Sequence, residues 1–263
     1  MTETKLSAYD RVCLARAKDR PGIVDYIDYL FEDFLELKGD RLGKEDSSIL
    51  GGIASFHGIP VTVIGHRKGK TTEENLLYNF GMSLPEGYRK ALRLMKQAEK
   101  FKRPVITFID TPGAYPGVEA ESHGQSIALA ECIAKMSTLE TPIIAIITGE
   151  GSSGGALALG VADQIWMLEN AVYSILSPEG FASILWKDAK RAREASELMK
   201  ITAGELLEFG LIDGVIPEGS KLMQQIEKML LTQLGDMQKV RTSALLKKRY
   251  QKFRNIDGTY RPR

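Results

Sequence analysis

Two apolar runs that each end in a glycine-rich loop constrain the fold of this chain more than any other feature. The run 104-PVITFID-110 leads into the loop DTPGAYPG, and 142-PIIAIITG-149 leads into 149-GEGSSGGALALG-160. Helical segments are expected after both loops, near 120–138 and 154–162. Strands that alternate with helices in this way favour an α/β domain with a largely parallel sheet. In such domains ligands bind at the carboxyl ends of the strands, which is where both loops are expected.

The rest of the sequence predicts further elements of ordinary length. Residues 49–56 and 60–65 are apolar runs joined at His57-Gly58, which predicts a β-hairpin. The apolar residues of 23–37 follow helical spacing, so the whole segment is expected to be one helix; they are Ile27, Leu30, Phe31, Phe34 and Leu35. The other expected helices are 7–20, 86–101, 178–186, 188–200 and 219–233, and the other expected strands are 164–168 and 172–176.

Composition and charge limit the class of protein. The chain has 263 residues and 43% apolar content, which is enough for one substantial core. A net charge of +1 gives no field that would attract nucleic acid or a membrane surface. The start, MTETKLSAYDRV, lacks the apolar stretch of a signal peptide, and no apolar run is long enough to span a bilayer. Cys13 and Cys132 are expected to be free thiols, so the sequence predicts a cytoplasmic protein.

Two segments concentrate positive charge. From Lys239 to the end of the chain, nine basic residues face one acid, and a solvent-exposed, partly frayed helix is the expected structure. The second segment, His66 to Lys70, has two interpretations. Its basic side chains could bind a phosphate or a carrier protein, or they could form an ordinary exposed turn.

Nucleotide hydrolysis is excluded by the spacing of its motifs. The sequence 110-DTPG-113 fits the D-x-x-G motif of GTPases, and 65-GHRKGKT-71 resembles a phosphate-binding loop. That loop requires four residues between its glycines, but Gly65 and Gly69 enclose three. The N-K-x-D motif that recognises guanine is also absent from the sequence.

A serine hydrolase stays open as an alternative. The sequence 151-GSSGG-155 fits the G-x-S-x-G motif between a strand and a helix, which makes Ser153 a candidate nucleophile. In α/β-hydrolases the histidine follows the serine, whereas His57, His66 and His123 all precede it here. Another fold could still bring His123 to Ser153, because the order of triad residues differs between folds.

The same loop also suits an oxyanion hole. Gly154, Gly155 and Ala156 are expected to open a helix, whose first turn has free N–H donors and a positive dipole end. Glycine lets a ligand approach the backbone without meeting a Cβ atom. Such donors stabilise an enolate or a similar anionic oxygen. Alternatively, the glycines only allow the helix and strand to pack closely.

Several long motifs resemble the α-subunit family of bacterial acetyl-CoA carboxylase carboxyltransferases. Besides the two loops, they are 36-ELKGDR-41, 80-FGMSLPEGYRKALRLMKQAEKF-101 and 177-SPEGFASILWKD-188. The similarity covers about residues 10 to 215. It implies the crotonase (ClpP)-like α/β fold, a spiral of β-β-α units. The expected organisation is an N-terminal helical segment, 1–38, a carboxyltransferase domain, 39–217, and a C-terminal helix with a basic tail, 218–263.

The resemblance also implies an activity and partners. Members of this family work with a zinc-bearing β subunit as an α2β2 heterotetramer. The assembly transfers a carboxyl group from carboxybiotin, presented by the biotin carboxyl carrier protein, to acetyl-CoA. The product, malonyl-CoA, is used for fatty acid synthesis, and a separate biotin carboxylase performs the ATP-dependent step. No covalently bound cofactor is expected on this chain, and zinc is expected on the β subunit. A carboxyltransferase for another acyl-CoA and a non-catalytic scaffold for the β subunit remain alternatives.

Carried onto this sequence, the resemblance assigns site residues. The oxyanion hole would consist of Gly154, Gly155 and Ala156. The implied substrate-binding residues are Gly113, Ala114, Tyr115, Gly117, Glu150 and Ser153. The family usually reads GEGGSGGA and AEERGQ, and here Ser152 replaces a glycine and His123 an arginine. Ser152 fits only if its φ is negative, and His123 substitutes a titratable group for a fixed charge.

Overall fold

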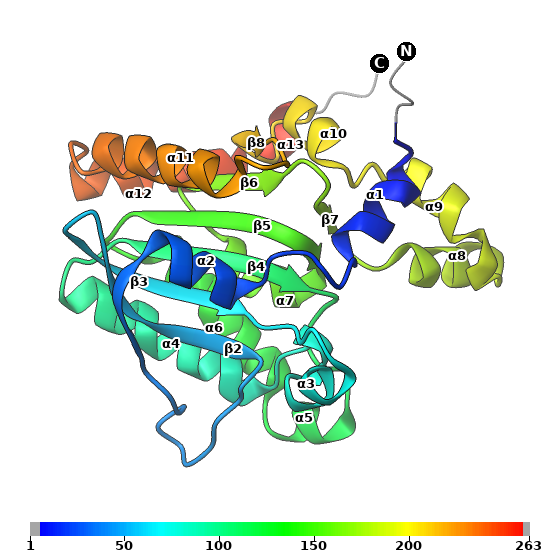
Figure 1. The fold of residues 1–263 in the computed structure, drawn as a ribbon, viewed down its shortest axis with the longest axis horizontal. Coiled ribbons are helices and arrows are strands. Elements are labelled where there is room, and N and C mark those ends of the chain that lie inside the picture. Colours follow the sequence, from blue (N-terminus) through cyan, green and yellow to red (C-terminus); the bar gives the residue numbers. More distant parts are fainter. Residues whose placement is uncertain (1–5, 260–263) are drawn as a thin grey trace.

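The computed structural model describes residues 6–259 and is built around an eight-stranded mixed sheet (Figure 1). Seven strands form a continuous path, in the order β1 (Glu32–Glu36), β2 (Ile49–Phe56), β3 (Ile59–His66), β4 (Val105–Thr111), β5 (Ile143–Ser152), β6 (Gln164–Leu168) and β8 (Gly214–Ile216). The first three are antiparallel, and from β3 onward every pairing is parallel. The short strand β7 (Val172–Ser174) pairs with the end of β5. The expected α/β architecture is confirmed.

The predicted hairpin joins β2 and β3. Phe56 pairs with Ile59, which leaves His57 and Gly58 as a two-residue turn. Both turn residues have positive φ, 49° and 79°, as in the turns whose twist matches that of the flanking strands.

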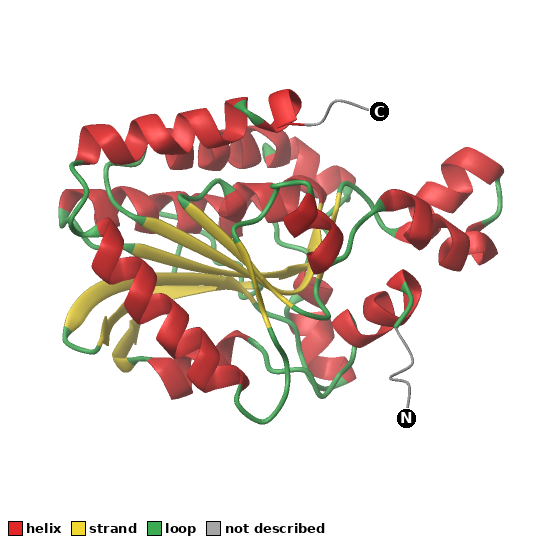
Figure 2. Cartoon of the chain, turned by 90° about the horizontal axis from the view of Figure 1, so that it is seen from above, coloured by secondary structure: helices red, strands yellow, loops and turns green. Residues whose placement is uncertain are grey.

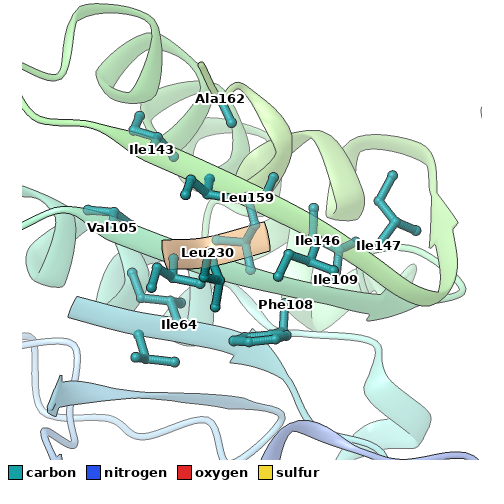
Figure 3. Close-up of a cluster of buried hydrophobic side chains, with 14 of the residues drawn as sticks. Ile64, Val105, Phe108, Ile109, Ile143, Ile146, Ile147, Leu159, Ala162 and Leu230 are labelled. Atoms are coloured by element: carbon teal, nitrogen blue, oxygen red, sulfur yellow. The ribbon is translucent and has the colours of Figure 1, made fainter. Parts of the chain in front are cut away.

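The centre of the core is the pair β4 and β5. All ten residues of β5 are buried, because strands flank it on both sides and helices cover both faces of the sheet. Its unbroken apolar run is typical of such a strand. Figure 3 shows Phe108 and Ile109 of β4 beside Ile146 and Ile147 of β5, with Leu230 packed against them.

Helices form a layer on each face of the sheet (Figures 1 and 2). On one face α4 (Pro85–Lys100), α6 (Gln125–Thr138) and α7 (Ser153–Gly160) contact one another. On the other face α2 (Ile23–Leu30) contacts α11 (Leu222–Met237). No helix within residues 6–259 combines the length and apolar character needed to cross a membrane.

The remaining helices are short or peripheral. A pair, α8 (Pro178–Trp186) and α9 (Ala192–Met199), projects from the body, and α1 (Ala8–Ala15) packs on α9 (Figure 1). The predicted helix 120–138 is interrupted at Gly124, which has a φ of 85°. The others are α3 (Thr72–Leu77), α5 (Val118–Ser122), α10 (Ala203–Glu208), α12 (Thr242–Arg254), α13 (Ile256–Thr259) and the 3-10 turns Asn79–Gly81 and Ala189–Arg191.

The prediction of one helix over 23–37 is wrong in its second half. Helix α2 ends at Leu30, and Phe31 is already extended, with a φ of −125°. The next residues form β1, which pairs antiparallel with β2. Phe31 and Phe34 still pack on the core, but from an extended segment. Apolar spacing at 3–4 residues was satisfied by both conformations, and pairing with β2 selected the strand.

The basic C-terminal segment is helical, as predicted, but it is not simply solvent-exposed. In α12, Arg249 is 1% exposed and Lys252 forms an ion pair with Asp213. Lys247 and Lys248 are exposed. Arg261 and Arg263 lie outside the described residues. The expectation is therefore wrong for the side of the helix that faces the sheet and α6.

Candidate active site

The two glycine-rich loops lie side by side, as expected for loops after neighbouring parallel strands. Thr111 at the end of β4 is paired with Gly151 near the end of β5. The first loop then continues through Gly113 and Ala114, and the second turns directly into α7 (Figure 1). One edge of the sheet therefore presents both backbones at the same place.

Hydrogen bonds to three surrounding segments fix the first loop. The Thr111 hydroxyl accepts from the Gly113 N–H at 3.0 Å and donates to the Gly113 carbonyl at 2.8 Å. The Tyr115 N–H donates to the Ser83 carbonyl at 3.0 Å, and the Gln125 amide donates to the Tyr115 carbonyl at 3.0 Å. Gly113 has a φ of +142°, which favours glycine.

The second loop makes a sharp turn at Ser153. Ser152 has a φ of −116°, so its side chain fits without strain, whereas Ser153 has a φ of +58°. Helix α7 starts with Ser152 as its N-cap, and the Ser152 side chain does not cap the helix. Helix geometry leaves the N–H groups of Ser153, Gly154 and Gly155 without intrahelical acceptors. By the same pattern, the Ala156 N–H is the first whose intrahelical acceptor exists, the carbonyl of the N-cap Ser152.

The two loops touch at Gly155. A Cβ atom on Gly155 would lie 2.7 Å from the Ala114 nitrogen and 2.8 Å from the Gly113 carbonyl carbon. No side chain fits at that position, so close packing is one real reason for this glycine. Gly154 is different, because its Cβ would meet only Leu129, at 3.4 Å. Gly155 serves the junction, and Gly154 leaves the backbone accessible beside it.

A buried charge network ties the ends of β4 and β5 together. The Lys68 ammonium lies 2.6 Å from Asp110 and 3.0 Å from Glu150, and Arg16 lies 2.7 Å from Glu150 and 2.8 Å from Glu179. The Glu150 N–H also donates to the Asp110 carboxylate at 2.9 Å. Burial alone would raise the pKa of Glu150, but the positive charges of Lys68 and Arg16 lower it below its usual value. Glu150 is therefore ionised, and its ion pairs and its N–H bond to Asp110 hold the two loops together.

Two hollows flank the loops. One, of about 360 Å³, borders the charge network, and its lining includes Arg16, Lys68, Phe80, Pro112 and Glu150. The other, of about 300 Å³, is mainly apolar and is lined by Ser153, Gly154, Leu157, Tyr173, Ser174, Ile175, Leu206 and Leu211. An apolar hollow beside free N–H donors suits an organic ligand that carries a negatively charged oxygen.

The structure does not assemble a hydrolase triad. His123 lies at the end of α5, where its ring is 3.8 Å from the Glu86 carboxylate. His57 is at the hairpin turn, and His66 is buried at the end of β3. Among residues 6–259, none of the three histidines forms a hydrogen bond with Ser153. The turn at Ser153, with its positive φ, resembles a nucleophile elbow, but the described part of the chain places no histidine against it.

The basic turn His66–Lys70 combines burial with ion pairing. His66 is buried, the Arg67 guanidinium stacks on the Tyr78 ring, and Lys70 pairs with Asp25. Lys68 belongs to the charge network. Sequence reasoning therefore missed the specific role of Lys68, and it missed Arg16 entirely. Arg16 gave no local signal, because its partner Glu150 is 134 residues away.

Comparison with known proteins identifies the family. The model of the family described as acetyl co-enzyme A carboxylase carboxyltransferase-like matches residues 2–257. The chain belongs to this family. An acetyl-coenzyme A carboxylase carboxyl transferase subunit alpha from Clostridium botulinum is 58% identical, over 95% of this chain and 94% of that protein. A protein from Natranaerobius thermophilus named subunits beta/alpha is 54% identical, over 96% of this chain and 43% of its own length.

Solved structures confirm the fold of this carboxyltransferase-like chain. Transcarboxylase 12S, crystallised with methylmalonyl-coenzyme A and methylmalonic acid, superimposes with a TM-score of 0.68 at 19% identity. The match covers 82% of this chain and 42% of that one. The crotonase-like α/β fold predicted from the family resemblance is thus borne out.

Proposed function

We propose that this chain is the α subunit of an acetyl-CoA carboxylase carboxyltransferase. The assembly would transfer a carboxyl group from carboxybiotin to acetyl-CoA and release malonyl-CoA. Family membership supports this activity, and relatives more than 50% identical carry the corresponding name. The observation that carries the proposal is the junction of the two glycine loops, where free N–H groups lie next to an apolar hollow.

The residues of this chain would act by stabilising negative charge. When carboxybiotin gives up its carboxyl group, charge develops on the ureido oxygen. The N–H groups of Gly154 and Gly155 lack intrahelical acceptors, and Ala114 N–H across the junction forms no hydrogen bond with the described chain. Each donor of this kind typically contributes about 10²–10³ in rate. Ala156, whose N–H is used within the helix, would contribute by packing behind Gly154 and Gly155.

The other assigned residues would shape the pocket. Gly113, with its positive φ, lets the first loop approach α7, and Tyr115 anchors that loop to Ser83. Gly117 has no room for a side chain, because its Cβ would lie 2.4 Å from the Tyr115 ring. Ser153 lines the apolar hollow, and Glu150 holds the two strand ends in register.

The partners follow from the same proposal. The relative that carries beta and alpha in one chain supports a β subunit as the direct partner. We expect an α2β2 assembly in which the β subunit holds zinc and contributes the acetyl-CoA side of the site. The biotin carboxyl carrier protein would deliver carboxybiotin, and biotin carboxylase would load it.

The test is reconstitution with the cognate β subunit. Malonyl-CoA-dependent carboxylation of free biotin, the reverse reaction, should appear only when both chains are mixed. Each chain alone is the control. A stable complex without activity would point to another acyl-CoA or to a scaffold role, and methylmalonyl-CoA in place of malonyl-CoA would separate these two. Failure to form any complex would refute the subunit assignment.

Two substitutions separate the oxyanion hole from the hydrolase alternative. Gly154→Ala should lower carboxyl transfer at least tenfold without lowering the melting temperature, because the added methyl group obstructs the backbone donors but meets only Leu129. Gly204→Ala, in open space on α10, is the matched control. Ser153→Ala should leave transfer within about twofold, because none of the histidines among residues 6–259 bonds to Ser153. Loss of activity in this variant would support Ser153 as a nucleophile.

A further inference from the structure

Tyr88 of α4 lies directly behind the junction of the two loops. Its hydroxyl oxygen is 2.9 Å from the position that a Cβ on Gly155 would occupy, the same position that lies 2.7 Å from the Ala114 nitrogen and 2.8 Å from the Gly113 carbonyl carbon. Its ring packs among α4, α6 and α7, against Ala128 and other small or apolar residues. Tyr88 is 0% exposed, so the hydroxyl cannot reach solvent.

This hydroxyl has no hydrogen-bond partner in the described chain. Its polar neighbour is the Ser83 hydroxyl, which is bonded to the Ser48 hydroxyl at 2.8 Å and does not meet the Tyr88 hydroxyl in hydrogen-bond geometry. Burial raises the pKa of Tyr88, so the phenol is neutral and remains a potential donor. A buried polar group without a partner costs free energy, and phenylalanine would fill the same space without that cost. The hydroxyl is therefore better explained by the loaded site than by the free protein.

We propose that Tyr88 is a positioning residue of the proposed carboxyltransferase site, whose hydroxyl donates a hydrogen bond to the Gly113–Ala114 peptide when an anion occupies the junction. The inference rests on the proposed function, because it needs an anion between the loops. For this bond to form the peptide must shift at Gly113, whose φ is +142°, against the two Thr111 hydrogen bonds that hold this glycine.

Such a bond would strengthen the site through the peptide. The Gly113 carbonyl already accepts from the Thr111 hydroxyl at 2.8 Å. A second donor at this carbonyl would polarise the peptide group further, so that the Ala114 N–H at its other end becomes a better donor to the ligand. Tyr88 would not touch the substrate, since α7 and the first loop cover it. Its contribution should appear where charge has developed, in kcat, rather than in ground-state binding.

The experiment compares two buried tyrosines in the complex with the β subunit. Tyr26 is the matched control: it is also 0% exposed, its hydroxyl also lacks a partner in the described chain, and its ring stacks on Phe108 away from the junction. Tyr88→Phe and Tyr26→Phe are each assayed for malonyl-CoA-dependent carboxylation of biotin and for melting temperature. Tyr88→Phe should lower kcat about tenfold, change KM less than twofold and leave the melting temperature equal or higher. Tyr26→Phe should leave kcat unchanged.

The outcomes are distinguishable. An active wild-type complex in which both variants match it overturns the role of Tyr88 and leaves the proposed function standing. A melting temperature several degrees lower for Tyr88→Phe than for Tyr26→Phe shows that the hydroxyl already has a structural partner, which also overturns the inference. A wild-type complex without activity refutes the proposed function and this inference with it.

Discussion

Arg249 and Lys68 are both cations that form short ion pairs with carboxylates, but their donors are used differently. Arg249 has five N–H groups, and all five are hydrogen-bonded. Two meet the Asp163 carboxylate, and three meet the main-chain carbonyls of Met136, Leu139 and Thr141. Its side chain is 1% exposed. This arginine closes α12 onto the end of α6 and has no donor left for a ligand.

Lys68, beside the site, is not used up in this way. Its ammonium group has three N–H donors, and two carboxylates, those of Asp110 and Glu150, accept from it. Its side chain is 22% exposed and lines a hollow next to the first loop. The third donor has no acceptor among residues 6–259.

The contrast separates a structural cation from one that can also serve a site. Because all five donors of Arg249 are hydrogen-bonded, this arginine can contribute only to the stability of the fold. Those bonds matter because a buried charge without partners is very costly. The unpaired donor of Lys68 costs less free energy, since water reaches this side chain. It also leaves the ammonium group able to hydrogen-bond to a ligand in the hollow. Three measurements test whether Arg249 acts only on folding and Lys68 also acts on the site.

The largest effect is expected for Arg249→Met. The substitution removes the positive charge beside the Asp163 carboxylate, which among the described residues keeps only the Ile143 N–H as a donor, and takes a donor from each of three main-chain carbonyls. It should lower the free energy of unfolding by about 3–5 kcal/mol. Urea denaturation of the isolated chain measures it. Lys248→Met, at an exposed position of the same helix, should change the same quantity by less than about 0.5 kcal/mol. A loss below about 1 kcal/mol for Arg249→Met would show that α12 does not depend on this arginine.

Lys68→Met should cost less stability but more activity. With two carboxylates facing each other at a partly solvated site, we expect a loss of about 2 kcal/mol, below the range for fully buried pairs. Misplaced loop ends should reduce carboxyl transfer about 100-fold. The neighbouring Lys70, exposed and paired with Asp25, gives the control Lys70→Met, with under about 1 kcal/mol expected. Equal effects of the two variants on stability and on carboxyl transfer would show that Lys68 is not part of the site.

The smallest expected effect is the change of folding stability at low pH. The pKa of Glu150 is lowered in the folded protein, so its contribution to stability is present above its ordinary value of 4.5 and is lost as pH falls through the folded pKa. The pKa of Lys68 is raised by the two carboxylates against the opposing effect of burial, so the lysine stays charged throughout this range. The stability difference between wild type and Lys68→Met should therefore narrow, by about 1 kcal/mol, as pH falls from 6 to 3. A constant difference would mean that the carboxylates do not carry the coupling.

The sequence predicted the centre of the fold because its signals there are local. The apolar run of β5 and the glycine loop after it specify strand, turn and helix within about 20 residues. The segment 31–37 was wrongly predicted as helix, because its apolar spacing is compatible with a helix and only pairing with β2 selects a strand. The burial of Arg249 was also not predictable, since Asp163 lies 86 residues away.

The site likewise contains residues that a local pattern reveals and residues that only distant contacts reveal. Gly154 and Gly155 were recognisable because a glycine pair at the start of a helix is a pattern in neighbouring residues. Tyr88 was invisible for the opposite reason: at helical spacing it is indistinguishable from any core aromatic, and its importance depends on contact with Gly155, 67 positions later. The ion pairs of Lys68 and Arg16 likewise link distant strands and helices.

The ion pairs of Arg16 also limit how early the site can be completed during protein synthesis. Arg16 is made well before its two partners, Glu150 and Glu179, which follow 134 and 163 residues later in the chain. Contacts over such separations form slowly, because the intervening chain must first be ordered. A nascent chain can pair β2 with β3 early, but the ion pairs of Arg16 beside the glycine loops cannot form until Glu150 and Glu179 have been made.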